Sequence, residues 1–257
     1  MANSSPIKIS DDLKIKLCSL ADRYEVASFT EEDPSQFLRW YRPEEGRGTV
    51  ADVEAASFIA AMLAFGNRKQ FIPKIRGILE TSDRSLGSLS EWLRAGAYKK
   101  DFPHGEAKFY RFYSYDDMQI FFGELGAILT KAGSLGEYFK LKKGILHEIV
   151  SSSFPKSSIV PKGRNSANKR IHMFLRWMVR RDSPVDLGLW KWADPESLII
   201  PLDTHVMQEA AKLGLISSVA TASRKTAELL TAAMQEVFPG DPCRGDFALF
   251  GLGVDVL

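Results

Sequence analysis

Cysteine is scarce in this chain. Only Cys18 and Cys243 are present, at opposite ends and without a Cys-x-x-Cys pair. This pattern argues against a structural zinc site and a four-thiolate iron–sulfur cluster, and it indicates a reducing compartment. The four histidines show no metal-ligand spacing either. We therefore expect no metal and no cofactor.

Long apolar runs and strand patterns are also absent. No run approaches the roughly 18 residues of a membrane span, and Met1–Ser10 lacks a signal-peptide core. We expect a cytoplasmic monomer that does not bind membranes. We find no alternating strand series, repeat or low-complexity tract. A chain of 257 residues can bury a substantial core, as one domain or as two interlocked lobes.

Helical periodicity dominates the sequence, and the predicted fold class is all-α. The segment 52–65 is apolar almost all round, so we expect it to be a buried central helix. Shorter helical segments are predicted at 36–41, 70–80 and 88–95, and 246–252 is a short apolar closing segment. Longer ones are predicted at 13–24, 115–132, 134–152 (as one helix or two), 171–181 and 224–237.

Positive charge is unevenly distributed although the net charge is only +2. Between Lys140 and Arg181 there are eleven lysines and arginines and one acid, Glu148. Such a segment is typical of a protein that binds a phosphate backbone, and the alternative is a solvated helix face. Within it, Pro161–Arg164 predicts a turn, and Asn165 and Ser166 supply helix-cap chemistry. This turn suits an anion-binding element or a simple basic connection between helices.

The segment Leu198–Leu215 reads LIIPLDTHVMQEAAKLGL. A strand-like lead-in precedes Asp203, which lies where a helix would start, and Gly214 marks the helix stop. A carboxylate at a helix N-terminus sits in a positive field and stays ionised. Asp203 is either a helix cap or a functional carboxylate, and spacing alone does not separate these roles.

This segment resembles the motif of the helix-hairpin-helix DNA glycosylases, the superfamily of endonuclease III and the 8-oxoguanine glycosylases. Their motif V-D-[TV]-H-[VI] opens a helix, and its aspartate is catalytic, which corresponds here to Asp203. More narrowly, NKRIHMFLRWMVRRD, VDLGLW, LIIPLDTHV and DFALFGLG together resemble an uncharacterised bacterial family of that superfamily, from about Leu13 to Leu257. The resemblance implies two interlocked helical lobes with the active site between them.

The resemblance also implies a nucleophile near the second helix of the hairpin. Bifunctional relatives use a lysine there, which displaces the base and forms an imine with the sugar. An ungapped alignment puts Ser166 at that position, and Lys169 follows one helical turn later. The long separation from Lys169 to Asp203 resembles that of archaeal 8-oxoguanine glycosylases, so we assign Lys169 as the nucleophile. The alternatives are a phosphate contact by Lys169 and attack by water.

Several further residues are candidates for contacts with DNA or with the base. The candidate DNA contacts are Lys162, Gly163, Arg164, Asn165, Ser166, Arg170, His205 and Asn67. For His205 a structural role at the helix start is the alternative, and for Asn67 it is a plain helix C-cap. The candidate base-pocket residues are Phe174, Trp177, Trp190 and Trp192.

We therefore expect a base-excision DNA glycosylase. It would remove a damaged base, 8-oxoguanine first among the candidates, from double-stranded DNA, with or without AP-lyase activity. Residues 1–257 would form one glycosylase-like unit, in which 12–155 and 224–257 are mostly scaffold helices and 156–215 carries the hairpin and the aspartate. The alternatives are a non-catalytic DNA-binding protein that retains the fold and a helical protein-interaction domain.

Overall fold

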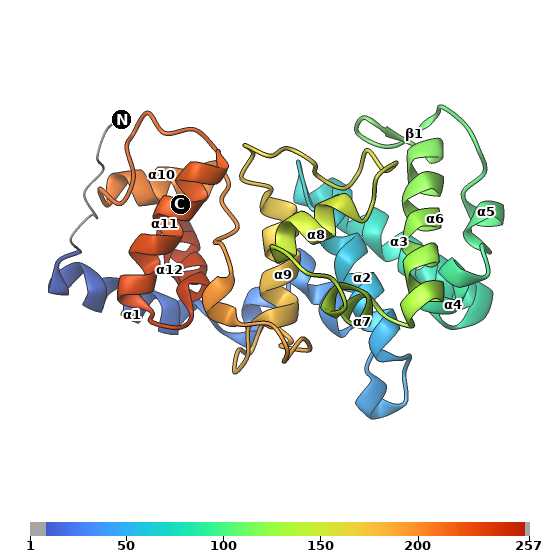
Figure 1. Cartoon of the computed structure of the whole chain (residues 1–257), viewed down its shortest axis with the longest axis horizontal. Helices are drawn as coiled ribbons and strands as arrows, with labels where there is room; N and C mark the ends of the chain where they lie inside the picture. Colours follow the sequence, from blue (N-terminus) through green and yellow to red (C-terminus); the bar gives the residue numbers. More distant parts are fainter. Residues whose placement is uncertain (1–8, 255–257) are drawn as a thin grey trace. The chain divides into compact units, whose positions relative to one another are not determined.

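The computed structural model describes residues 9–254 (Figure 1). Most of these residues are helical, so the all-α class is confirmed. The only sheet within them is a hairpin of β1 (Lys108–Tyr110) and β2 (Tyr113–Ser114), which the sequence did not predict. Met1–Ser10, for which we predicted no signal-peptide core, lies largely outside the described residues. No helix of the described range combines the length and apolarity that a membrane span requires.

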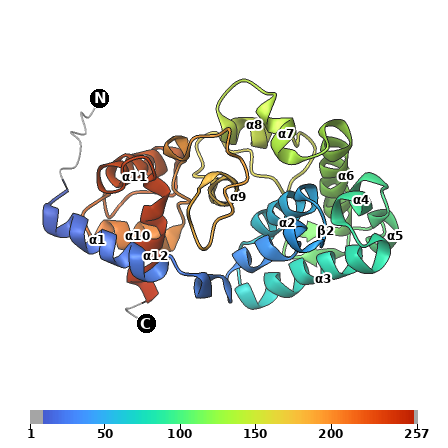
Figure 2. The same ribbon diagram turned by 90° about the horizontal axis from the view of Figure 1, so that it is seen from below.

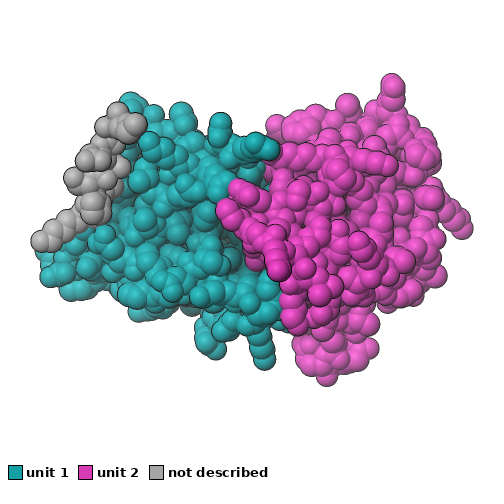
Figure 3. Space-filling view, viewed as in Figure 1, with its two compact units in different colours: residues 1–29, 163–257 teal, residues 30–162 magenta. Residues whose placement is uncertain are grey.

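The chain forms two compact units, coloured separately in Figure 3. Residues 30–162 form the inserted unit. The segment that ends at Phe29 and the residues from Gly163 onward form the other, which we call the split unit. One boundary falls between Lys162 and Gly163. This boundary falls inside both the predicted functional segment 156–215 and the basic segment between Lys140 and Arg181. Part of each segment therefore belongs to one unit and part to the other.

The inserted unit is organised around α2 (Val50–Leu63), in which nearly every residue is buried, as predicted for a central helix. The helix begins at a capping box formed by Thr49 and Asp52. The second carboxylate oxygen of Asp52 accepts hydrogen bonds from the Ser90 amide (2.7 Å) and the Ser88 hydroxyl (2.8 Å). The remaining helices of this unit are α3 (Arg68–Leu86), α4 (Leu89–Arg94), α5 (Tyr98–Asp101), α6 (Tyr115–Ala132), α7 (Leu135–Lys140) and α8 (Leu146–Ser152).

Hydrogen bonding to Asp52 fixes its charge state. Burial acts to raise its pKa, but the bonds from Ser90, Thr49 and Ser88 outweigh burial and hold the pKa below its ordinary value. A buried carboxylate thereby joins the first turns of α2 and α4.

The split unit contains α1 (Asp11–Tyr24), α9 (Lys169–Val179), α10 (Thr204–Lys212), α11 (Arg224–Val237) and α12 (Gly245–Val254). Helix α12 packs against both α1 and α10, and these helices lie together in Figure 2. At one contact, a side chain on Gly253 would clash with the ring of His205. The helices at both ends of the chain therefore share one core.

Helix α9 begins close to the predicted segment 171–181. Its first residue is Lys169, and Asn168, not Asn165 or Ser166, is its N-cap, at φ +44°. The backbone before it is instead held by α11 and its lead-in, because Asn165 accepts a bond from the Arg224 amide (2.8 Å) and Ser166 pairs with Ser223. Since α8 ends at Ser152, a long loop and not a tight hairpin joins α8 to α9.

Two glycines of the inserted unit provide a matched test of its packing. A methyl group on Gly126 in α6 would clash with the Leu93 carbonyl oxygen on α4, whereas one on Gly77 in α3 meets nothing within 4 Å. We expect Gly126→Ala to lower the free energy of unfolding by about 1–3 kcal/mol through overpacking. Gly77→Ala should raise it by about 0.5–1 kcal/mol through helix propensity. Urea unfolding of both variants measures this. Equal effects would contradict the close approach of α4 and α6.

Candidate active site

Lys169 and Asp203 are brought into direct contact in the split unit. Lys169 is the first residue of α9, and its ammonium donates to Asp203 Oδ2 at 2.7 Å across 34 residues of sequence. Asp203 is the N-cap of α10, as predicted, and its Oδ1 accepts from the Val206 amide at 2.9 Å. The two side chains remain 37% and 34% exposed, so an external molecule can reach them.

The surroundings of Asp203 keep it ionised. Burial acts to raise its pKa, but the charge and hydrogen bond of Lys169 and the bond from Val206 outweigh burial. The pKa of Asp203 therefore lies below its ordinary value. A carboxylate that stays negative at neutral pH can accept a proton from a neighbouring amine and stabilise positive charge nearby.

Two arginines follow Lys169, Arg176 within α9 and Arg180 as its C-cap, and they hold this helix in the core. Arg176 is 4% exposed and pairs with Asp186 (Nε to Oδ1, 3.3 Å) and with Asp246. Arg180 is 2% exposed and pairs with Asp186, Glu25 and Asp241, each at 2.7 Å. Lys169 and Arg176 are two turns apart, so they share one face of α9.

Asp246, in the first turn of α12, is a site residue that the sequence analysis missed. It pairs with Arg176, and the charges of Lys169 and Asp203 act on it as well. Burial raises the pKa of Asp246 to about 6, against the effect of Arg176 and Lys169. Asp246 lies 43 residues beyond Asp203, so spacing gave no signal. The only sequence indication was its place in the quoted segment DFALFGLG.

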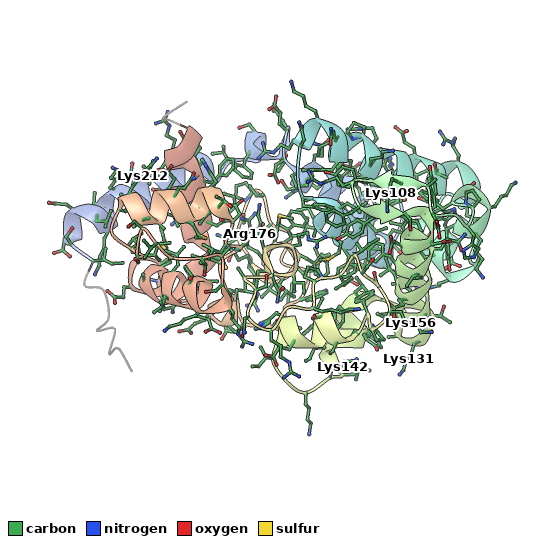
Figure 4. The ribbon with its side chains drawn as sticks, turned by 90° about the horizontal axis from the view of Figure 1, so that it is seen from above. Lys108, Lys131, Lys142, Lys156, Arg176 and Lys212 are labelled. Carbon is green, nitrogen blue, oxygen red and sulfur yellow. The ribbon has the colours of Figure 1, made fainter. Side chains whose placement is uncertain are left out.

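The basic segment between Lys140 and Arg181 is not one surface. Arg176 and Arg180 lie in the core because carboxylates distant in sequence pair with them. In Figure 4, Arg176 lies among the helices of the split unit, whereas Lys142 lies at the edge of the inserted unit. The interpretation of this segment as a single phosphate-binding stripe was therefore wrong, and only its exposed members can contact a phosphate backbone.

The loop residues before α9 are largely exposed. Lys162, in the inserted unit, donates to the Pro155 carbonyl at 2.7 Å. In the split unit, Gly163, Arg164, Asn165 and Ser166 are exposed. Asn168 does not cap α9 with its side chain, which donates instead to the Gly163 carbonyl at 2.8 Å. The positive end of the α9 dipole therefore lacks a side-chain cap, a condition that favours an anion.

The remaining candidate DNA contacts have defined structural partners. Asn67 is not a C-cap; it is the N-cap of α3, where its Oδ1 accepts from the Lys69 amide at 2.9 Å. Its side chain is exposed but lies in the inserted unit. His205 is half-buried with its ring 6.2 Å from that of Phe250, which favours the structural alternative. Arg170 is half-buried beside Lys169.

The four predicted base-pocket residues do not form an open pocket. Phe174, Trp177 and Trp190 are at most 1% exposed. Trp192 is 38% exposed and stacks on Trp190 at 5.5 Å. Sequence position could not reveal that three of these rings are core, because helical periodicity and pocket lining use the same residue types. Only Trp192 offers a face that a base could stack on.

The arrangement at Lys169 and Asp203 suits amine chemistry. A primary amine beside a carboxylate can lose its proton to that carboxylate and attack an electrophilic carbon. In the described range, no group of three or more histidine, cysteine or acidic side chains is placed to hold a metal ion. A cavity of about 850 Å³ lies elsewhere in the split unit and is lined by Arg180 and Asp241 but not by Lys169 or Asp203.

Comparison with known proteins gives one match. The model of the family described as "Protein of unknown function (DUF2400)" matches residues 33–255. No curated protein and no solved structure matches the chain. The match includes residues of both units, among them Lys169, Asp203 and Asp246.

The raised pKa of Asp246 predicts a pH-dependent stability. Because the folded state binds this proton more tightly than the unfolded chain, the resulting stabilisation is complete below the ordinary pKa of 3.8 and is lost as pH rises through about 6. Asp246→Asn cannot titrate. We therefore expect the free energy of unfolding of the wild type, minus that of Asp246→Asn, to fall between pH 4.5 and 7. Urea titrations across this range test it. A constant or rising difference would contradict the assigned shift.

Proposed function

The chain belongs to the DUF2400 family, and we propose that it is a DNA glycosylase that excises a damaged base from double-stranded DNA. The observation that carries the proposal is the 2.7 Å contact between Lys169 and Asp203, each at the N-terminal end of its helix. This is the amine and carboxylate pair that the resemblance to helix-hairpin-helix glycosylases implied. Partial exposure leaves the pair open to a nucleotide flipped from the duplex.

In the proposed reaction, the Lys169 ammonium first gives a proton to the Asp203 carboxylate. The free amine attacks C1′ of the damaged nucleotide, a C–N bond forms, and the N-glycosidic bond breaks with its electron pair leaving on the base, which takes up a proton. That proton comes from Asp203, and the carboxylate thus restored stabilises the positive charge that develops on the sugar. Opening of the sugar ring gives an imine, from which β-elimination would break the 3′ C–O bond.

The proposal also covers the identity of the damaged base. The 34-residue separation between the two groups supports an oxidised purine, and 8-oxoguanine is the first lesion to test. Trp192 is the exposed aromatic residue of the predicted set and offers a stacking face, a contact worth about 1–3 kcal/mol per base.

Covalent trapping tests the nucleophile. We expect borohydride to cross-link the wild-type protein to an 8-oxoguanine duplex, because it reduces the imine to a stable secondary amine. Lys169→Gln should abolish the cross-link, as glutamine cannot form an imine. Lys212→Gln removes an exposed lysine from α10 and should cross-link like the wild type. Denaturing gel electrophoresis gives the readout. Trapping that survives Lys169→Gln would move the nucleophile elsewhere, and excision without trapping would assign attack to water.

Asp203→Asn separates the catalytic role from the helix cap. Asparagine caps helices as well as aspartate, and the pair with Lys169 is partly exposed, so we expect a loss of stability of about 1 kcal/mol or less. Excision should fall by about 100-fold or more, because the negative charge is gone. Asp194→Asn makes the same change at another cap of the split unit and should leave excision unchanged. Near wild-type excision by Asp203→Asn would reduce Asp203 to a cap.

DNA affinity tests the loop before α9. Arg164 is exposed in the loop that leads to the start of α9, so Arg164→Gln should weaken binding to any duplex and lower the salt slope by about one. Lys16→Gln on α1 is the matched control and should bind as the wild type does. Fluorescence anisotropy between 50 and 200 mM salt is the measurement. If the wild type binds duplex DNA but excises no lesion, the result would favour the non-catalytic DNA-binding alternative.

A further inference from the structure

The hairpin of β1 and β2 in the inserted unit carries the aromatic run FYRFY, residues 109–113. Such a run suits either core packing or the stacking of nucleic-acid bases. Phe109, Tyr110 and Tyr113 are at most 8% exposed and belong to the core. Phe112 is 59% exposed. Core packing therefore accounts for three of the four rings and not for Phe112.

The exposed ring lies in a tight turn. Tyr110 pairs with Tyr113 across the hairpin, so Arg111 and Phe112 are the two residues of the turn. Arg111 has φ +50°, a left-handed conformation for which hairpin turns favour glycine, asparagine or aspartate. An arginine in this conformation stores backbone strain, and such strain clusters at sites that bind ligands. The turn therefore combines a large cation with a large exposed ring at a strained position.

Contacts with the end of α2 hold the turn in place. The Tyr110 hydroxyl donates to the carbonyl of Phe65, which follows α2 directly. The Phe112 ring lies 5.3 Å from the ring of Phe65 and 4.7 Å from that of Tyr113. These two rings support Phe112 from the protein side, and its large exposed fraction leaves the other side open to solvent. A side chain that is already ordered loses little conformational entropy on binding a planar ligand.

Arg111 places a positive charge next to this ring. Its guanidinium lies 5.8 Å from the centre of the Phe65 ring and is hydrogen-bonded to the Tyr110 hydroxyl oxygen. Both of these partners are neutral, so they orient the charge of Arg111 without cancelling it. Lys108, labelled in Figure 4, is a second cation of the hairpin, but its charge acts on the carboxylate of Asp117. Arg111 is therefore the cation that the turn offers to an anion.

We propose that Phe112 and Arg111 bind an unpaired base of a single-stranded nucleic acid. The ring stacks on the base, and the guanidinium pairs with a phosphate of the same strand. Bases inside a duplex are already stacked on one another, so an exposed ring on a turn reaches only an unpaired base. Every base has an aromatic face, so we expect binding that tolerates any sequence.

This proposal goes beyond the glycosylase and does not rest on it. The hairpin lies within residues 30–162, whereas Lys169 and Asp203 belong to the split unit. The test uses strands that carry no lesion, so excision activity affects none of its results.

Fluorescence anisotropy of the full chain with a labelled oligothymidine tests the proposal. Phe112→Leu keeps an apolar side chain but removes the ring, and it should lose at least about fivefold in affinity. Phe112→Trp keeps an aromatic face and should bind at least as tightly as the wild type. Leu86→Ala is the matched control, because it trims another exposed apolar side chain of the inserted unit, at the end of α3, and should bind as the wild type does.

A strand of the same length without bases separates stacking from charge. The wild type and Phe112→Leu should bind this abasic strand equally, because it offers phosphates but no base. Arg111→Gln should weaken binding to both strands and lower the salt slope by about 0.7, the value for one phosphate contact with a single strand. A parallel titration with oligouridine identifies the preferred strand as DNA or RNA.

Phe112 is exposed on a turn, so we expect its variants to fold, and far-UV circular dichroism checks this. Absence of oligothymidine binding by the wild type, or equal binding by Phe112→Leu, would overturn the proposal. An equal loss of affinity by Phe112→Leu on the abasic strand would overturn it as well, because the ring would then act through the fold and not through a base.

Discussion

Burial of two arginines, Arg176 on α9 and Arg180 directly after it, is the constraint on which the split unit depends. Arg176 and Arg180 are almost fully buried, and carboxylates from α12, from the loop after α9, from the connection between α11 and α12 and from the end of α1 surround them. A buried charge that loses its partner costs about 3–5 kcal/mol, so the network holds only if all these segments are in place. The pair of Arg180 with Glu25, 155 residues away, joins the segment before the inserted unit to the residues that follow it.

The same network gives the candidate active site its geometry. Since α9 is fixed by its buried arginines, its first residue, Lys169, is fixed as well. Asp203 is fixed independently, because it caps α10, which packs on α12. The N-terminal ends of α9 and α10 therefore meet at a partly exposed ion pair, and the buried arginines and their carboxylates hold α9 in place. Asp246 links the buried network to this ion pair. It pairs with buried Arg176, and the charge of Lys169 acts to lower its pKa.

Sequence reasoning succeeded where a local pattern determines the structure. The central helix α2, the cap at Asp203 and helix α11 follow from apolarity, capping chemistry and helix propensity. The contact of Lys169 with Asp203 came from a resemblance, because no spacing rule links residues 34 apart. The N-cap residue of α9, the burial of the aromatic residues and the role of Asp246 could not be predicted. Each depends on partners distant in sequence, such as the pairing of Ser166 with Ser223.

The central claim is that the Lys169 amine is a nucleophile held against Asp203. Peptide mapping by mass spectrometry locates a covalent adduct directly. The full chain is reduced with borohydride on an 8-oxoguanine duplex, the DNA is digested, and the protein is cleaved to peptides. The account predicts the mass of the reduced sugar remnant on the peptide that contains Lys169, and on that residue within it. A remnant on another lysine, such as Lys162 in the inserted unit, would contradict the assignment.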